Sequence, residues 1–285
     1  MSYQDSDAAL HWVERVSEFV PTFIREHPGL GLVAECGDLI LTGSTTQGVV
    51  DEHSDLDLEL VLPEDAVAQV DSVSSTRYIE FHLDGKPGSV IVVSAEAWNS
   101  MIDACDMPLI AELRQAVMVT ESTGIATKLI EKARQTMTPE VRRAFFFYNY
   151  FEMRSFHRGA DNPLNRNDAV PAYLNTSQAL LHALRACLSL EGEPYPYDKW
   201  LWKSASQTET GQKLSPHVNS ILDHLADDAL RLPGPESDNP LSQDFREIRG
   251  VLIDSARQSG IDEPWLVRWW EHINQARSAT SSVRW

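Results

Sequence analysis

The spacing of hydrophobic positions changes partway along this chain. In the first 120 residues, one amphipathic helical pattern precedes several short apolar or alternating runs, and such runs predict strands. The expected strands cover residues 38–42, 56–62, 78–83, 89–93 and 116–120. The expected helices cover residues 8–27, 64–71, 95–104 and 107–115. This part of the chain therefore predicts a small mixed sheet with helices packed on it.

From residue 123 onward, apolar positions recur at helical spacing throughout. The helices expected there cover residues 139–158, 168–190, 216–230, 241–258 and 263–278, with a surface loop at 232–240. The whole pattern predicts an α+β protein with a mixed-sheet domain over residues 1–121. An all-helical bundle domain is expected over residues 122–285. A chain of 285 residues is long enough for two modest cores.

The composition narrows the class of protein. Hydrophobic residues make up 42% of the chain and charged residues 23%, as in ordinary globular proteins. We see neither an apolar run of membrane-spanning length nor a secretory pattern at the N-terminus, so we expect a cytoplasmic protein with no membrane partner. Cys36, Cys105 and Cys187 are far apart and match no zinc spacing, which indicates free thiols.

The residues that most clearly indicate a binding or catalytic site lie between positions 41 and 58. Gly43 and Ser44 follow an apolar strand, and Asp55 and Asp57 alternate with leucines on the next. Side chains two apart on a strand share a face, so the two carboxylates can bind one divalent cation. Gly43 allows a phosphate to approach the backbone, and Ser44 offers it a hydroxyl and an amide. The alternative is an ordinary strand with a solvated acidic face, which leaves the Gly-Ser turn unexplained.

These residues resemble the signature of the nucleotidyltransferase superfamily of the DNA polymerase beta type. That signature places Gly-Ser about ten residues before two acids that alternate with hydrophobic residues, as at positions 55–58 here. The resemblance implies an enzyme that uses Mg²⁺. It assigns Asp55 and Asp57 to the metal as catalytic residues, and Gly43 and Ser44 to the nucleotide.

The resemblance also implies a third carboxylate on a neighbouring strand. Glu80 stands between Ile79 and Phe81 and has the hydrophobic-acid-hydrophobic setting that this position requires. We therefore expect Glu80 to be the third catalytic and metal-binding residue. Asp84 is the rival, although Asp84-Gly85 is typical of a hairpin turn.

The C-terminal half contains two basic clusters of interest. Arg154, His157, Arg158 and Arg166 surround an expected turn at residues 163–165, and a solvated basic face is the alternative interpretation. The second cluster is the segment 194–203, in which Tyr-Pro-x-x-Lys-Trp includes Lys199.

The Tyr-Pro-x-x-Lys-Trp arrangement is similar to the helical domain of bacterial small-molecule nucleotidyltransferases, a group that includes enzymes that adenylylate aminoglycosides. The resemblance implies that Lys199 binds the triphosphate, unless it is only a surface lysine. Arg154 and Arg166 are further candidates for nucleotide binding.

The charge distribution bears on the substrates. The net charge is −18, and residues 1–120 carry 21 Asp and Glu against only 5 Lys and Arg. A nucleoside triphosphate bound there needs counter-charge from metal ions and from the second half. The same field disfavours nucleic acid and favours a cationic acceptor, although a general adaptation for solubility would give the same composition.

The resemblance and these residues together predict an enzyme that moves AMP from ATP, or a nucleotide from another NTP, to a small hydroxylated acceptor. An aminoglycoside-like acceptor would connect the protein with antibiotic resistance. The alternatives are a nucleotidyltransferase acting on a protein or tRNA, as in toxin–antitoxin systems, and a catalytically silent nucleotide-binding regulator.

Overall fold

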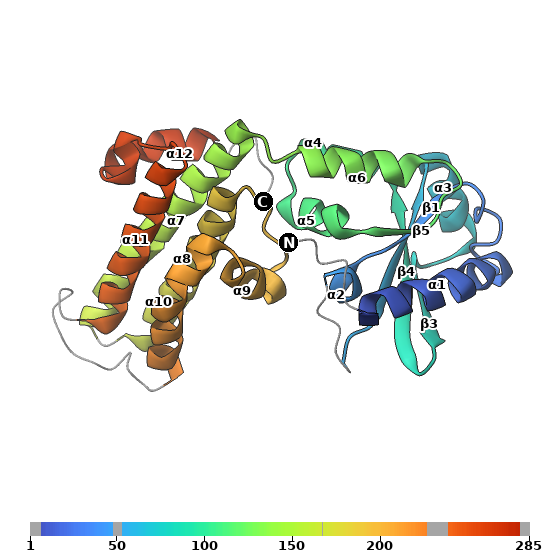
Figure 1. The fold of residues 1–285 in the computed structure, drawn as a ribbon, viewed down its shortest axis with the longest axis horizontal. Helices are drawn as coiled ribbons and strands as arrows, with labels where there is room; N and C mark the ends of the chain where they lie inside the picture. Colours follow the sequence, from blue (N-terminus) through green and yellow to red (C-terminus); the bar gives the residue numbers. More distant parts are fainter. Residues whose placement is uncertain (1–6, 48–52, 167, 227–238, 280–285) are drawn as a thin grey trace. The chain divides into compact units, whose positions relative to one another are not determined.

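The computed structural model describes residues 7–47, 53–166, 168–226 and 239–279. The chain divides into two compact units, Met1–Thr136 and Met137–Trp285 (Figure 1). The first unit includes a helix beyond residue 121, α6 (Ile125–Gln135), which packs against α4, α5 and the sheet. The α+β class expected from the sequence is confirmed.

The first unit is built on one five-stranded mixed sheet in the order β3-β4-β2-β1-β5. Its strands are β1 (Asp38–Leu41), β2 (Leu56–Leu62), β3 (Tyr78–Leu83), β4 (Lys86–Ser94) and β5 (Val117–Thr120). Strands β2 and β4 are parallel, whereas the other three pairs are antiparallel. All five expected strands are therefore present, at nearly the expected positions.

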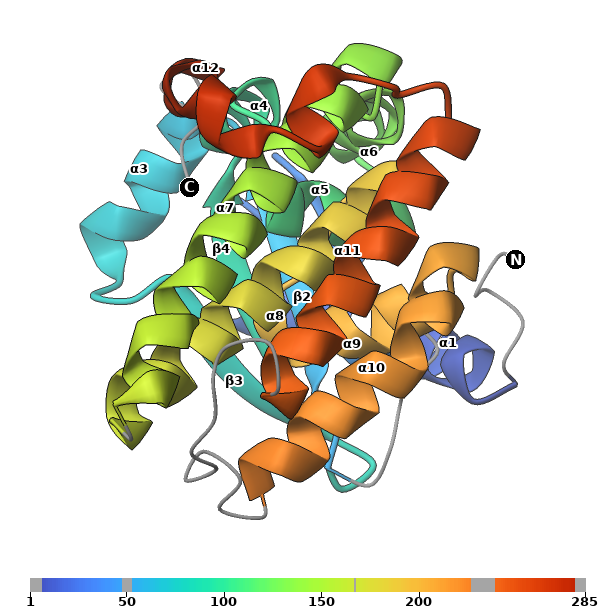
Figure 2. The same cartoon turned by 90° about the vertical axis from the view of Figure 1, so that its left-hand side faces the viewer.

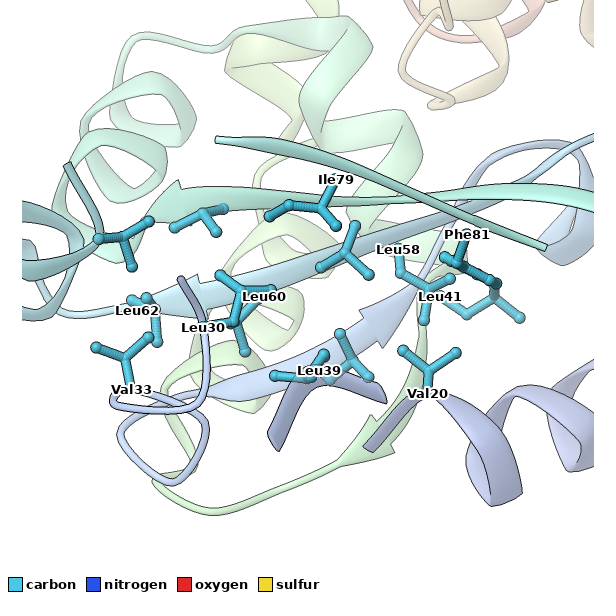
Figure 3. Close-up of a cluster of buried hydrophobic side chains, with 14 of the residues drawn as sticks. Val20, Leu30, Val33, Leu39, Leu41, Leu58, Leu60, Leu62, Ile79 and Phe81 are labelled. Atoms are coloured by element: carbon cyan, nitrogen blue, oxygen red, sulfur yellow. The ribbon is translucent and has the colours of Figure 1, made fainter. Parts of the chain in front are cut away.

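One face of the sheet forms the hydrophobic core of the first unit, which Figure 3 shows in close-up. Helices α1 (Asp7–Glu26) and α3 (Glu64–Val73) pack on this face. Alternate residues of β2 point into it because side chains along a strand alternate between faces. Core residues labelled in the figure are Val20, Leu30, Val33, Leu39, Leu41, Leu58, Leu60, Leu62, Ile79 and Phe81.

The opposite face is partly covered by α6, which packs on β1 and β2, and by α4 (Ala95–Asp103), which packs on β4. The short helix α5 (Met107–Gln115) packs against both. Asp38 at the start of β1 is fully buried, and its carboxylate accepts hydrogen bonds from four backbone N–H groups at residues 122–126. This carboxylate anchors the N-terminus of α6 to the sheet, as expected for an acid at the positive end of a helix.

The second unit is helical throughout the residues that the structure describes (Figure 2). Its helices are α7 (Pro139–Asn165), α8 (Ala169–Glu191), α9 (Asp198–Ser206), α10 (Glu209–Ala226), α11 (Pro240–Gln258) and α12 (Ile273–Ala279). Two 3₁₀ turns, η4 (Pro264–Leu266) and η5 (Trp269–His272), precede α12. Helices α7 and α8 pack along each other, and α11 contacts both.

Several expected boundaries in this unit were wrong. Helix α7 continues through Pro163 to Asn165, so the turn expected at 163–165 is helical and the chain turns after it. Helix α10 begins at Glu209 and holds Pro216 in its interior, whereas the sequence suggested a start at that proline. The helix expected over 263–278 is broken into η4, η5 and α12.

No described helix combines the length and the apolar character needed to cross a membrane.

Candidate active site

The turn after β1 places Gly43 directly against Asp57. Gly43–Thr46 forms the short helix α2, and Gly43 has φ +70, a conformation that side-chain-bearing residues avoid. A Cβ atom at Gly43 would lie 2.3 Å from Oδ2 of Asp57, so no larger residue fits without moving this carboxylate. The Thr42 N–H also donates a 2.9 Å hydrogen bond to the Asp57 carbonyl. The glycine expected to admit a phosphate therefore admits the Asp57 side chain as well.

Asp57 belongs to the strand whose other face forms the core. It is the second residue of β2, and Asp55 immediately precedes the strand. The Asp57 side chain points away from the core face, which receives Leu56 and Leu58. The shared face of Asp55 and Asp57 stays a prediction. Asp55 is exposed and Asp57 is half-buried. Both carboxylates belong to the class of hard oxygen ligands that Mg²⁺ prefers, so the pair fits a divalent cation.

Glu80 faces the same side as Asp57 but lies two strands away. Ser89 on β4 pairs with Asp57 on one side and with Glu80 on the other, and paired residues point to the same face. Two strand spacings put the Glu80 backbone roughly 10 Å from that of Asp57. The expectation that the Glu80 strand neighbours the Asp strand was wrong, because β4 lies between them. Ser89, which lies between the two acids on the sheet, is buried.

Asp84, the alternative to Glu80, belongs to the β3–β4 turn and has φ +52. Its carboxylate pairs with Arg15 of α1 at 2.7 Å. In the described part of the chain, no three His, Cys, Asp or Glu side chains are grouped closely enough to hold a metal ion. Asp55, Asp57 and Glu80 therefore do not form a preassembled three-carboxylate cluster.

Glu59 is a buried acid beneath this site that sequence reasoning did not single out. It follows Asp57 on the same face of β2 and is only 6% exposed. Burial, and then the charges of Glu112 on α5 and of Asp57, raise the pKa of Glu59 well above its usual range, against a smaller opposing effect of Thr42. A protonated Glu59 carries no charge and so reduces the repulsion at Asp57. The sequence feature that could have identified Glu59 is its position on a strand whose other face consists of leucines.

Hydroxyl groups around Gly43 are buried without hydrogen-bond partners. Oγ of Ser44 and Oγ1 of Thr45 are both inaccessible, and neither finds a partner within the described structure. Buried polar groups are nearly always hydrogen-bonded, so unpaired hydroxyls in one turn indicate a bound water or ligand. This turn lies beside two acids, which is the setting expected of a site for a phosphate with its cation.

The structure places Lys199 in the second unit, in the first turn of α9. Lys199 is exposed, with its Nζ 5.6 Å from the centre of the Trp200 ring. The preceding Tyr195 and Pro196 are buried core residues, and Arg185 lies over the Tyr195 ring at 5.0 Å. The assignment of Lys199 to the triphosphate stays a prediction.

Arg154 and Arg166 also belong to the second unit. Arg166 is exposed, immediately after α7. Arg154 is not on a solvated face: its Nε and Nη1 atoms are buried, and its guanidinium lies 5.7 Å from the centre of the Trp269 ring. The basic face expected along α7 is therefore divided, because Arg154 and His157 turn inward and Arg158 is exposed.

Comparisons with known proteins find similarity at the level of structure. No family model matches the sequence, and no curated protein matches it. Among solved structures, the chain is similar to a nucleotidyltransferase-like protein from Exiguobacterium sibiricum 255-15, with a TM-score of 0.46 and 13% sequence identity. The alignment covers 87% of this chain and 77% of that one. The function proposed below rests on the residues of this chain and their geometry.

Proposed function

We propose that this protein is a metal-dependent nucleotidyltransferase that moves a nucleoside monophosphate, AMP from ATP, to a hydroxyl group of a small acceptor. The observation that carries this proposal is the contact between Gly43 and the Asp57 carboxylate. It joins a turn with unpaired buried hydroxyls to an acidic pair on the next strand. A phosphate turn and a pair of carboxylates at one point are what nucleotidyl transfer requires.

The acidic pair would hold the cation, and the turn would hold the phosphates. Asp55 and Asp57 supply carboxylate oxygens, and Ser44 supplies a buried hydroxyl with no other partner. When bound, Mg²⁺ offsets the negative charge that develops on the phosphoryl and pyrophosphate oxygens. The chain itself contributes position: Gly43 keeps the turn close enough for both ligands to meet Asp57.

Glu80 is the group that we assign to the acceptor's proton. In the reaction, the acceptor oxygen forms a bond to the α-phosphorus, and the bond from that phosphorus to pyrophosphate breaks. The hydroxyl proton must leave at the same time. Glu80 is exposed on the face that carries Asp57, and Ser89 of β4 pairs with both residues. A carboxylate in this place can accept the proton.

The charge of the first half supports a cationic acceptor. Residues 1–120 carry 16 more acids than bases, and a surface of one sign raises the local concentration of ligands of the opposite sign. An amino sugar such as an aminoglycoside combines hydroxyl groups with positive charge. The same field repels polyanions, so tRNA is a weaker candidate.

The test is transfer of label from α-³²P-ATP to aminoglycosides, neutral sugars, tRNA and total protein, run in parallel with Mg²⁺. We expect labelled amino sugar and no labelled macromolecule. Glu80→Gln should lower the rate at least tenfold, whereas Asp84→Asn, which removes only the Arg15 pair, should keep it. Label on tRNA or protein alone would refute the small acceptor, and no label on any acceptor would refute the transfer itself.

A further inference from the structure

Arginine side chains converge between α7 and α11, inside the second unit. Arg154 projects from α7, and Arg246 and Arg249 project from α11, one turn apart. We propose that Arg154 and Arg249, with Arg246, form a binding site for a phosphate-type oxyanion, separate from the Asp55–Asp57 site. The proposal does not depend on the proposed function, because every residue in it belongs to the helical unit.

Arg154 has donors that no group in the described structure satisfies. Its Nε and Nη1 atoms are inaccessible and have no hydrogen-bond partner. Its charge lies near the Tyr150 hydroxyl, and its guanidinium plane lies over Trp269 at 5.7 Å. A guanidinium held by an aromatic ring on one side, with two free N–H edges, has the geometry that binds phosphate oxygens in pairs.

Arg249 faces the same place from the other helix. Its Nε is also buried without a partner. Burial, and then the charge of Arg249, lower the pKa of Arg154, against a raising effect of Tyr150. The structure gives neither Arg154 nor Arg249 an ion pair with a described carboxylate. Two like charges that are partly buried and unpaired are costly unless an anion lies between them. The pair is therefore better explained by a ligand than by packing.

His157 lies close enough to all three arginines for their charges to affect its pKa. It lies one turn after Arg154 on α7, and its ring stacks on Phe245 of α11 with centres 4.9 Å apart. Burial, and then the charges of Arg154, Arg246 and Arg249, lower the pKa of His157 to about 3. Its imidazole is thus neutral, and the positive charge of the site belongs to the arginines.

Asp161 is an acid of α7 that lies near His157. It accepts a 2.6 Å hydrogen bond from the Ser242 hydroxyl, and its carboxylate is 4.0 Å from Nε2 of His157. It makes no ion pair with Arg154 or Arg249 in the described structure. The charges of these two arginines are therefore not compensated by an ion pair, and a doubly charged phosphate would balance them.

The test measures binding of inorganic phosphate to the full-length protein without Mg²⁺, by calorimetry. We expect saturable binding of one phosphate per chain, and Arg249→Gln should weaken it at least tenfold. Arg158→Gln is the matched control, because Arg158 is an exposed arginine of α7 that lies next to His157. Asp57→Asn should bind phosphate as the wild type does, which separates this site from the proposed active site.

Thermal unfolding distinguishes a ligand site from a packing role. In phosphate-free buffer, Arg249→Gln should melt at or above the wild-type temperature, because it relieves repulsion with Arg154. In phosphate, the wild type, Arg158→Gln and Asp57→Asn should gain stability, and Arg249→Gln should not. ATP in place of phosphate shows whether a nucleotide can supply the oxyanion. Absence of saturable binding of either anion, or equal binding by Arg249→Gln, would overturn the proposal.

Discussion

The Asp57 carboxylate occupies the space that a side chain at position 43 would need. The distance from Oδ2 of Asp57 to a Cβ built on Gly43 is 2.3 Å, well inside van der Waals contact. A larger residue in the turn after β1 would therefore displace the acid on β2. The glycine is therefore as much a part of the acidic site as the aspartate is.

Gly43→Ala should reduce nucleotidyl transfer at least a hundredfold. The new methyl group must displace the Asp57 carboxylate, and φ +70 adds a backbone strain of about 1 kcal/mol. Circular dichroism should show an unchanged fold, and the assay is transfer of label from α-³²P-ATP.

Gly85→Ala is the matched control for this prediction. Gly85 has a similar φ of +82 in the β3–β4 turn, but a Cβ there would meet no atom within 4 Å. It should lose a similar amount of stability and keep full activity. Equal activity in the two variants would show that the contact with Asp57 has no role in catalysis.

Asp38→Asn should destabilise the first unit by about 2–4 kcal/mol. Burial alone would raise the pKa of Asp38, but the backbone donors of Thr123, Ala126 and Ser122 together outweigh it and lower the pKa. An amide side chain carries no charge and presents one oxygen to these N–H groups. Urea unfolding at pH 7 measures the loss.

The sign of the pH effect follows from the lowered pKa of Asp38. Its contribution is complete above the unfolded pKa of about 3.9 and disappears as the pH falls through the lower folded value. Asp71→Asn is the control, since Asp71 is exposed and pairs only with Arg77 in the described contacts. It should change stability little, and an equal loss in both variants would contradict the role given to Asp38.

The second unit should lose stability between pH 6.5 and 4 because of His182. Burial, and then the charge of Arg185, lower the pKa of His182 to about 4, and its Nδ1 lies 2.9 Å from the Asn149 oxygen. The unfolded chain binds the proton more readily, so stability is complete above about pH 6.5 and falls below it. His182 should contribute about 2 kcal/mol to the loss from pH 7 to 5, and His157, whose pKa is also lowered, adds to the total.

His182→Gln should make this pH dependence shallower, and the exposed His82→Gln should leave it unchanged. Urea unfolding followed by tryptophan fluorescence is suited to the test, because six of the eight tryptophans lie in residues 137–285. An identical slope in wild type and His182→Gln would show that His182 is not kept neutral by the fold.

Lys199→Ala should weaken ATP binding by about ten- to a hundredfold, the value of one charge-assisted contact. Binding of the acceptor alone should not change. Lys203→Ala is the control, because Lys203 is exposed on the same helix and lies 6.0 Å from the same Trp200 ring. An unchanged Michaelis constant and turnover for ATP would show that Lys199 is only a surface lysine.

Local patterns predicted the strands and the acidic pair because these depend on residues close in the sequence. The alternation of Asp55, Asp57 and Glu59 with leucines predicts both a strand and its two faces. The turn at Asp84-Gly85 likewise follows from residues that tolerate positive φ. These features need no knowledge of the rest of the fold.

Strand order and the burial of individual side chains could not be predicted from local sequence patterns. A parallel pair of β2 with β4 places Ser89, not Glu80, beside Asp57, and that choice depends on packing across the whole sheet. The inward turn of Arg154 and the burial of Glu59 depend on partners far away in the sequence, on Trp269 and on α5 respectively. Helical periodicity continues across Pro163 and Pro216, where proline suggested an end or a start.

Nucleotidyl transfer by the acidic pair is the central claim, and Asp57→Asn tests it most directly. The variant should fold and melt no lower than the wild type, because it removes a negative charge that disfavours the ionised form of the buried Glu59. Transfer of label from α-³²P-ATP should require Mg²⁺ in the wild type and fall to background in Asp57→Asn at every Mg²⁺ concentration. Full transfer by a folded Asp57→Asn protein would contradict the account.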